Sequence, residues 1–219
     1  MKGEIIMCNL LYKEFRLTVH PTIYMFMLIG ALLCVPAYPY CMVFLFGCLG
    51  LYFTTQFARE NHDVFFTSTL PIMKRDVVKG RCLLFMAVEI GQMLISIPFS
   101  IARIWIIPEG NPVGIEANVA FYGFGFLIYA VYNFFFLTQF YKSAYKVGQS
   151  FIIAIIPAII VGVAMEYLPR VAGMQWIDSI AIKNLTRQLP ILVVGVIVYF
   201  LVMKLTYVIA AKRFEKVDL

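Results

Sequence analysis

The sequence lacks the local motifs that mark nucleotide hydrolysis and hydrolytic catalysis. No G-x-x-x-x-G-K-[ST] segment is present to hold phosphate groups, and Gly123-Phe124-Gly125 lies inside an apolar run instead of after a strand. Neither H-E-x-x-H nor G-x-S-x-G occurs, and no paired carboxylates mark a catalytic pocket. We therefore expect no catalytic residues, no ATP hydrolysis by this chain and no cofactor bound to it.

Metal-ligating residues are also scarce. The chain has two histidines and five cysteines, and no two cysteines form a C-x-x-C pair. Scattered cysteines of this kind are typical of buried, reduced thiols, and they predict no metal site. The cysteines are Cys8, Cys34, Cys41, Cys48 and Cys82, and the histidines are His20 and His62.

Charge is scarce too, and this decides the class of protein. Only 14% of the 219 residues are charged, whereas 62% are hydrophobic, and the mean hydropathy is +0.87. This balance excludes a soluble domain of this length. The apolar runs have the length of helices and not of alternating barrel strands. We expect an all-α polytopic membrane protein with a single transmembrane domain over residues 1–219.

Six apolar runs follow one another, and each predicts a transmembrane helix. Residues 2–17 mix apolar and charged positions, which predicts a helix lying in the membrane interface before a turn at His20-Pro21. The start of the chain does not resemble a cleavable signal, so the first span is expected to remain. The six spans are expected at residues 22–35, 38–57, 82–107, 118–141, 149–168 and 188–211.

The basic residues are distributed unevenly between the loops. Thirteen of them lie in residues 1–21, 58–81, 142–148 and 212–219, while the opposite set of loops has Arg170, Lys183 and Arg187. The positive-inside rule therefore places both termini in the cytosol. The net charge of +6 reflects this topology, and it does not indicate nucleic-acid binding because the basic residues flank span ends.

The long charged segment at residues 57–81 contains two adjacent phenylalanines, Phe65 and Phe66. Such side chains must be covered by a partner protein, or else dip into the bilayer surface as part of an interfacial helix. Asn61 is a suitable N-cap for a short helix that reaches about Thr67. Pro71 is suited to start the next helix, which leads into the third span.

The third predicted span contains a polar stripe. Its members fall at helical offsets of three, seven, eleven and fourteen residues, which stay within about 60° of one helix face. Ionisable groups inside a span rarely face lipid, so the stripe is expected to line a translocation path or a subunit seam. Alternatively, its two charged members merely extend toward the two membrane surfaces. The stripe consists of Glu89, Gln92, Ser96, Ser100 and Arg103.

The fourth predicted span is rich in aromatic residues and carries hydrogen-bonding groups at Tyr129 and Asn133. A weakly polar aromatic wall would suit an amphipathic substrate. Ordinary helix packing and an interfacial aromatic belt account for the same pattern.

Residues 70–81, LPIMKRDVVKGR, resemble the S-L-P-[VI]-[ST]-R-x-[ED]-[IV]-V-x-[GA]-[KR] segment of small bacterial ABC-2 type transporter permeases. Glu60, Asn61 and Asp63 fit the stretch before it, while the chain departs from the pattern at Thr69, Met73 and Lys74. Within that family the segment is most similar to permeases that export phenol-soluble modulins, which are amphipathic peptides.

The resemblance implies a multi-pass permease in a bacterial cell membrane. It also implies a second permease copy or a sister chain, and two copies of a separate ATPase that binds ATP and Mg. The ATPase would dock on the loop between the second and third spans. The resemblance assigns this coupling role to Asp63, Val64, Phe65, Phe66 and Leu70, with Lys74 and Arg75 as charge partners.

Three functions stay open at this point. The first is the export of amphipathic peptides or other membrane-active compounds by an ATP-driven permease. The second is the same machine moving lipid or a small molecule. The third is a membrane sensor or immunity protein that binds a peptide without transporting it, and which would work without any ATPase.

Overall fold

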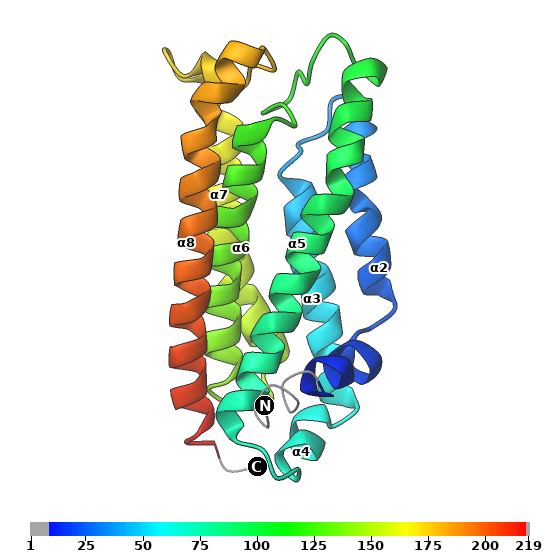
Figure 1. Cartoon of the computed structure of the whole chain (residues 1–219), viewed down its shortest axis with the longest axis vertical. Helices are drawn as coiled ribbons and strands as arrows, with labels where there is room; N and C mark the ends of the chain where they lie inside the picture. Colours follow the sequence, from blue (N-terminus) through cyan, green and yellow to red (C-terminus); the bar gives the residue numbers. More distant parts are fainter. Residues whose placement is uncertain (1–8, 218–219) are drawn as a thin grey trace.

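The computed structural model describes residues 9–217, and every regular element in that range is helical. Residues 9–13 are helical and continue into the π-helical turn η1 (Glu14–Thr18). The long helices run side by side in one elongated bundle (Figure 1). The elements that follow are α2 (Thr22–Met27), η2 (Leu28–Cys34), α3 (Met42–Glu60), α4 (Asp63–Ser68), α5 (Lys74–Ile106), α6 (Val119–Phe140), α7 (Val147–Tyr167), η3 (Leu168–Arg170), η4 (Gln175–Ile177) and α8 (Ile182–Phe214).

Four helices of the described residues are long and apolar enough to cross a membrane, namely α5, α6, α7 and α8. The helical pair Asn9–Thr18 and Thr22–Cys34, bent by 93°, counts as a fifth if it forms one span. Helix α3 has 19 residues and ends in Arg59 and Glu60, and it is not among them. The structure therefore establishes an all-helical membrane protein with four or five candidate spans.

The first apolar run forms two helical types in succession, the α-helix α2 and the 3-10 helix η2. Its 13 residues extend for about 23 Å, because a 3-10 helix rises about 2.0 Å per residue and an α-helix about 1.5 Å. The 3-10 geometry thus lengthens a segment that is short in sequence. The chain then turns at residues 35–39, with Ala37 in a left-handed conformation (φ 57°).

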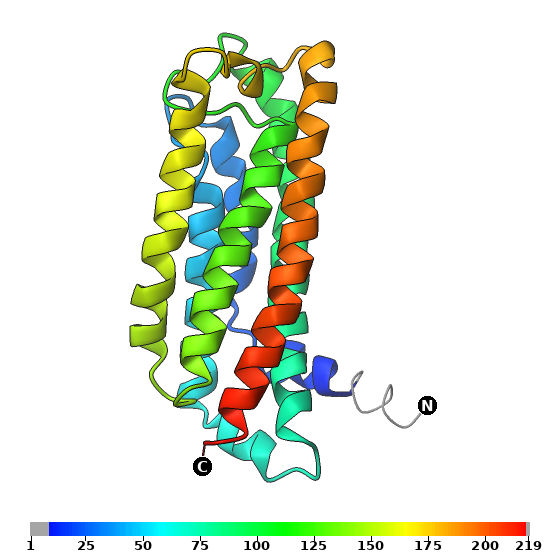
Figure 2. The same cartoon turned by 90° about the vertical axis from the view of Figure 1, so that its left-hand side faces the viewer.

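The connections fall into two groups at opposite ends of the bundle. One end, here called the α4 end, holds α4, the turn at 141–146, the crosswise helix at residues 9–18 and the last turn of α8 (Figures 1 and 2). The opposite end holds the connections at 35–41, 107–118 and 168–181 (Figure 2). The loops rich in basic residues were expected on one side of the membrane, and in the structure they lie together at the α4 end.

Helices α6 and α8 pack in close contact through two glycines. A Cβ atom on Gly195 would lie 2.3 Å from the backbone oxygen of Gly123, far closer than such atoms approach. Small residues allow membrane helices to approach until their backbones touch. These glycines fix α8 against the first turns of α6.

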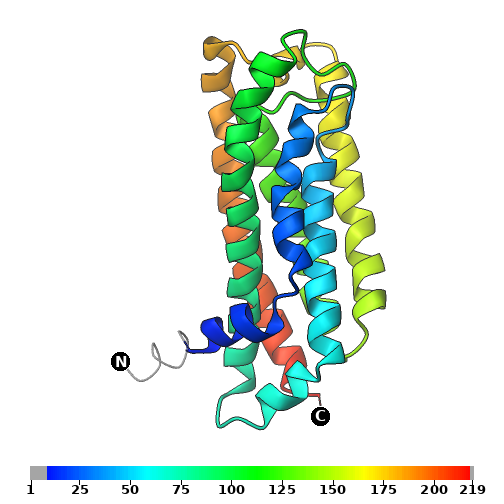
Figure 3. The ribbon, with the colours of Figure 1, turned by 90° about the vertical axis from the view of Figure 1, so that its right-hand side faces the viewer.

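The N-terminal helical segment lies across the bundle and not along it (Figure 3). Leu10, Glu14 and Thr18 are buried against the protein, whereas Tyr12 and Leu17 are exposed. An outward apolar face next to an inward polar one is typical of a helix lying on a membrane surface. A helix is therefore present from residue 9, where the interfacial helix was expected, and its location in the membrane interface stays a prediction. Residues 2–8 of the expected helix fall outside the described part of the chain.

Two expectations about helix starts are wrong. Asn61 follows the last residue of α3, and His62, in a left-handed conformation (φ 53°), precedes α4 instead. Pro71 lies in the connection before α5, which begins three residues later at Lys74. Helix α3 continues to Glu60, so the chain has no room for an N-cap at Asn61.

The cysteines of the described residues have free thiols. Cys41, Cys48 and Cys82 are buried as expected, whereas Cys34 is only partly buried. Cys8 lies outside the described residues.

Candidate functional site

Helix α4 sits across the α4 end of the bundle and joins α3 to α5 (Figure 1). Asp63 and Val64 are both buried, while Phe65 and Phe66 are 58% and 52% exposed. Leu70, just after the helix, is also exposed. The first two residues of α4 therefore pack against the protein. The next two, Phe65 and Phe66, point outward, as expected for side chains that a partner or the bilayer surface would cover.

A buried charged cluster holds α4 in place. The carboxylate of Asp63 accepts a hydrogen bond from the Arg81 guanidinium at 2.8 Å, and Lys13 Nζ lies 2.5 Å from its other oxygen. Lys13 also donates to Thr67 Oγ1 at 2.8 Å. Arg81 belongs to α5 and Lys13 to the N-terminal helix, so one carboxylate joins three segments that are distant in sequence.

Glu14 completes this cluster. Its carboxylate lies 3.1 Å from Arg81 Nε and 3.0 Å from Lys13 Nζ. Glu14 is fully buried and Arg81 is 2% exposed. Two cations therefore face two anions, and this balance is what makes burial of the four charges tolerable. We call Lys13, Glu14, Asp63, Thr67 and Arg81 the α4 cluster.

A glycine allows the N-terminal helix to approach α5 at this point. A Cβ atom on Gly80 would lie 3.0 Å from the Leu10 side chain, tighter than most such contacts. Gly80 directly precedes Arg81 in α5, so the close approach brings Glu14 within reach of that guanidinium. Sequence reasoning did not find Lys13, Glu14 or Arg81, because the pairing of Glu14 with Arg81 spans 67 residues and no local pattern encodes it.

Lys74 and Arg75, at the start of α5, contact the chain's own C-terminal segment. Lys74 Nζ donates to the backbone oxygen of Val217 at 2.7 Å, and Arg75 Nε lies 2.5 Å from the Glu215 carboxylate. The hydrogen bond from Arg75 lowers the pKa of Glu215 below its usual value. Both cations are thus shared with the end of α8, and their role toward a partner stays a prediction.

The polar stripe of α5 points into the bundle, and all five of its side chains are buried. In its middle, Glu89 accepts hydrogen bonds from Tyr199 OH on α8 at 2.5 Å and from Asn133 Nδ2 on α6 at 2.9 Å. Glu89 is 1% exposed. It therefore connects α5, α6 and α8 near the bundle centre.

Gln92 makes the next link in the stripe. Its amide donates to the backbone oxygen of Val43 on α3 at 2.7 Å and accepts from Tyr129 OH on α6 at 2.9 Å. Asn133 and Tyr129, the two residues singled out on α6, thus both meet the stripe. The structure thus brings Glu89 together with Asn133, and Gln92 together with Tyr129, inside a single chain.

Arg103 ends the stripe at the opposite end of the bundle. It forms an ion pair with Glu116, from the connection at 107–118, and donates to Tyr40 OH at 3.1 Å. Glu116 also accepts from the backbone N–H of Asn111. Arg103 therefore does not extend to the solvent, and it fastens the connection after α5 to the bundle. Glu116 and Tyr40 were not found from the sequence, again because the contacts are long-range.

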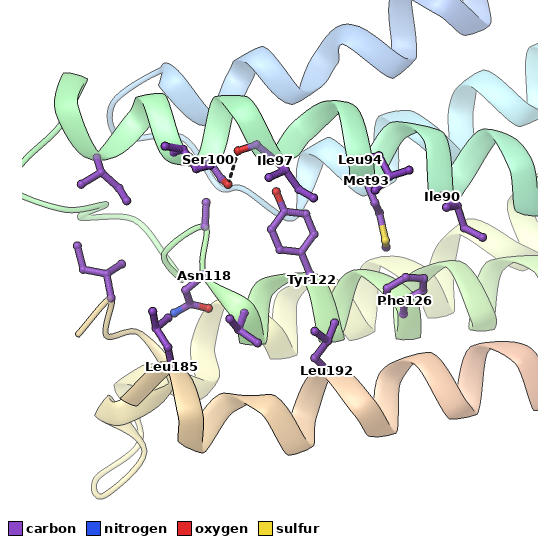
Figure 4. A pocket seen from close by; sticks show the side chains of 15 residues that line it. Ile90, Met93, Leu94, Ile97, Ser100, Asn118, Tyr122, Phe126, Leu185 and Leu192 are labelled. Atoms are coloured by element: carbon purple, nitrogen blue, oxygen red, sulfur yellow. Dashed lines mark hydrogen bonds between the residues drawn. The ribbon is translucent and has the colours of Figure 1, made fainter. Parts of the chain in front are cut away.

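An apolar cavity of about 400 Å³ lies between α5, α6 and α8 toward the opposite end (Figure 4). Tyr122 points from α6 toward α5, and its hydroxyl is 3.1 Å from Ser96 Oγ. Ser100 lines the cavity. Leu94 and Ile101 also line it and are exposed at the bundle surface, so the cavity opens sideways into the surroundings of the helices.

Comparison with known proteins gives one match. A family model described as ABC-2 family transporter protein matches residues 9–215 of this chain. No curated protein matches the sequence, and neither does any solved structure.

Proposed function

The chain belongs to the ABC-2 family of transporter proteins, and from this premise we propose that it is the membrane subunit of an exporter driven by a separate ATPase. Members of such a family supply the membrane component of transport. The chain itself carries no phosphate-binding motif. ATP and Mg would accordingly be bound by the partner.

One observation carries the proposal: α4 presents exposed aromatic side chains while its base is fixed in a buried ionic cluster. Phe65 and Phe66 are exposed beside Asp63, whose carboxylate is bound to Arg81 of α5. Exposed aromatics clustered at one site are typical of protein interfaces. We infer that an ATPase subunit covers this surface.

The α4 cluster would transmit movement of that ATPase to the spans. Any displacement of α4 must move Asp63, and leaving Arg81 without this carboxylate inside the protein would cost several kcal/mol. Helix α5 and the N-terminal helix would therefore move together with α4. Since α5 carries the polar stripe, the displacement would reach the contacts of Glu89 and Gln92 with α6.

We further propose that the stripe becomes a translocation path or a subunit seam during transport. In the structure its polar groups bind partners on α3, α6 and α8. Movement of α5 away from α6 would expose Glu89, Gln92, Tyr129 and Asn133. Polar groups in a membrane bundle are tolerated where they line a cavity or a contact between chains.

The substrate class proposed is amphipathic peptides or other membrane-active compounds. The cavity between α5, α6 and α8 supports this, because its wall is apolar with hydroxyl groups at Ser100 and Tyr122, and it opens sideways. A substrate that is already in the membrane could reach it without crossing water. Lipid or small-molecule transport by the same machine is the alternative within this function.

The assembly proposed contains two ATPase copies and a second permease, either another copy of this chain or a sister chain. We propose that α3 crosses the membrane as a sixth span beside α2 and η2. The excess of basic residues in the loops at the α4 end supports placing both termini in the cytosol of a bacterial cell.

The proposal is tested by expressing the chain with its neighbouring genes and purifying it. A Walker-motif ATPase should co-purify in roughly equal amount, and Phe65→Ala with Phe66→Ala should release it, because each interface aromatic contributes on the order of 2 kcal/mol or more. Trp105→Ala is the matched control, since Trp105 is an exposed aromatic at the other end of α5.

Three outcomes are informative. Loss of the ATPase in the double variant but not in Trp105→Ala supports the proposal. Retention of the ATPase in both variants would show that α4 is not the docking surface. A chain that is active without any ATPase would instead favour the sensor or immunity function.

A further inference from the structure

A second, larger groove lies on another face of the bundle, between α3 and α7. It measures about 540 Å³, and its walls are almost entirely apolar. It is separate from the cavity that opens beside α5, and none of the polar stripe residues line it. The wall residues that matter below are Leu45, Phe46 and Leu49 from α3, and Ile155, Ile159 and Val163 from α7.

The α3 wall of the groove has about the depth of one membrane leaflet, and the α7 wall is longer. The lining extends over residues 39–49 on the α3 side, about 15 Å at helical rise, and from Phe151 to Arg170 along α7 and η3, about 28 Å. One leaflet of hydrocarbon is about 15 Å thick. Arg170 is the last residue of the candidate span Val147–Arg170. The groove therefore runs from hydrocarbon depth to the level of lipid headgroups at the opposite end of the bundle.

Arg170 places a positive charge at the rim of this groove. It is exposed, donates to the backbone oxygen of Val113, and stacks over the Tyr167 ring at 5.1 Å from the ring centre. A guanidinium has five N–H donors in a planar fork, so most of its donors stay available. Among the described residues, no carboxylate lies within ion-pair distance of Arg170.

Two carboxylates lie nearby, and both are already engaged. Glu166 lines the groove, and its two oxygens accept from the backbone N–H groups of Cys41 at 2.7 Å and Ile115 at 2.9 Å. Asp178 shares a small polar pocket of about 110 Å³ with Arg170 and accepts from the backbone N–H of Glu116 at 2.6 Å. The cation at the rim is thus the group with free hydrogen-bonding capacity.

We propose that this groove binds a phospholipid of the leaflet at the opposite end of the bundle, with one acyl chain between α3 and α7 and the phosphate on Arg170. The long apolar wall matches a hydrocarbon chain, and the guanidinium matches a phosphate in both charge and geometry. Its position next to Tyr167 at the end of a span is where headgroups lie. The proposal does not rest on the transport function.

A bare hydrocarbon or a second protein copy would fit less well. Neither supplies an anion to Arg170 unless a carboxylate of the second copy lies opposite it. A lipid that provides chain and phosphate together satisfies both parts of the site. The experiment below separates these occupants.

The test is native mass spectrometry of the full chain after reconstitution in nanodiscs of phosphatidylcholine with a tenth of either phosphatidylglycerol or diacylglycerol. The wild type should retain phospholipid and not diacylglycerol. Arg170→Gln should lower retention about tenfold, as expected for loss of a charge-assisted hydrogen bond. Arg187→Gln is the control, because Arg187 is also exposed near the same end of the bundle.

A second pair of variants tests the acyl-chain part of the site. Ile159 lines the groove and is 41% exposed, whereas Ile160, its neighbour on α7, is 64% exposed and outside the groove. Ile159→Trp should fill the groove and lower phospholipid retention, and Ile160→Trp should leave it unchanged. Equal retention in all variants would overturn the proposal.

The remaining outcomes also overturn it. Equal retention of diacylglycerol and phospholipid would mean that the groove selects hydrocarbon only and that Arg170 has no part. A dimer that dissociates in Ile159→Trp, with no lipid bound in the wild type, would assign the groove to a second copy. Loss of the folded protein in Arg170→Gln is checked by its elution volume before lipid is counted.

Discussion

Helix α5 has a buried arginine near each end, and the two are used differently. Arg81, at the α4 end, binds Asp63 and Glu14 from two separate helices. Arg103, at the opposite end, binds Glu116 from the connection that follows α5 itself. The first arginine thus joins α5 to the N-terminal helix and to α4, whereas the second holds a connection against the bundle.

The two ends also differ in what they expose. Beside Arg81, α4 presents Phe65 and Phe66 to the surroundings. Beside Arg103, the carboxylates of Glu116 and Glu166 accept backbone N–H groups, which holds the connections in place. Under the proposed function, a partner would act on the α4 end through this short exposed helix, while the opposite end would resist change. The following predictions test this contrast.

The largest effect is expected for Arg81→Ala. This change leaves Glu14 and Asp63 buried with Lys13 as their remaining cation, and losing one partner of a buried charge cluster costs roughly 3–5 kcal/mol. The free energy of unfolding in detergent measures it. Arg75→Ala is the control, because its ion pair with Glu215 is exposed and should contribute nothing measurable. Equal stability of the two variants would contradict the role of the cluster.

A smaller loss is expected for Arg103→Ala, on the order of 2–3 kcal/mol. Glu116 would lose its cation but keep the N–H of Asn111 as a donor. Limited proteolysis of both variants would show which segment each arginine holds in place. Cleavage should increase within residues 107–118 in Arg103→Ala and within residues 9–18 in Arg81→Ala. The same cleavage pattern in both variants would mean that the two ends are not independent.

Glu89→Gln tests the middle of α5, between the two ends. An amide keeps acceptor capacity for Tyr199 and Asn133, so the free energy of unfolding should change by about 1 kcal/mol or less. Transport of a labelled amphipathic peptide into inverted vesicles should nevertheless fall, if exposure of the carboxylate is part of the path. Ser150→Ala, on α7 and away from the stripe, is the control. Full transport by the Glu89→Gln variant would show that the Glu89 carboxylate is not part of the translocation path.

The smallest effect concerns Asp178 at the opposite end. Burial raises its pKa from 3.8 to about 6, so the folded protein binds this proton more tightly than the unfolded chain. The resulting stabilisation is present below pH 3.8 and is lost as the pH rises through 6. Asp178→Asn should therefore show a flatter dependence of the melting temperature between these pH values. Identical pH profiles would contradict the raised pKa.

Much of the fold could be predicted from the sequence. The apolar runs located α5, α6, α7 and α8. The start of α4 was predicted wrongly. Asn61 is a good N-cap in isolation, but α3 continues to Glu60, so α4 begins later. The number of spans stays at four or five among the described residues, since α2 with η2 is short and α3 ends in charged residues.

The candidate site was predictable only in part. The exposure of Phe65 and Phe66 followed from the short helix and its local pattern. The polar stripe was visible because helical periodicity places Glu89, Gln92 and Arg103 on one face. Their partners were not visible, because Tyr199 lies 110 residues from Glu89 and Glu116 lies in a connection without periodicity.

The sequence by itself determined the membrane class, the helix positions and the loops that carry positive charge, because hydropathy, helical periodicity and charge counts depend only on local composition. The tertiary structure alone decided which charges meet. Lys13, Glu14, Asp63 and Arg81 come from three helical segments, and only folding brings them close enough to balance one another inside the protein. The physical reason is that a buried charge needs an opposite charge nearby in space, and distance along the chain does not specify that partner.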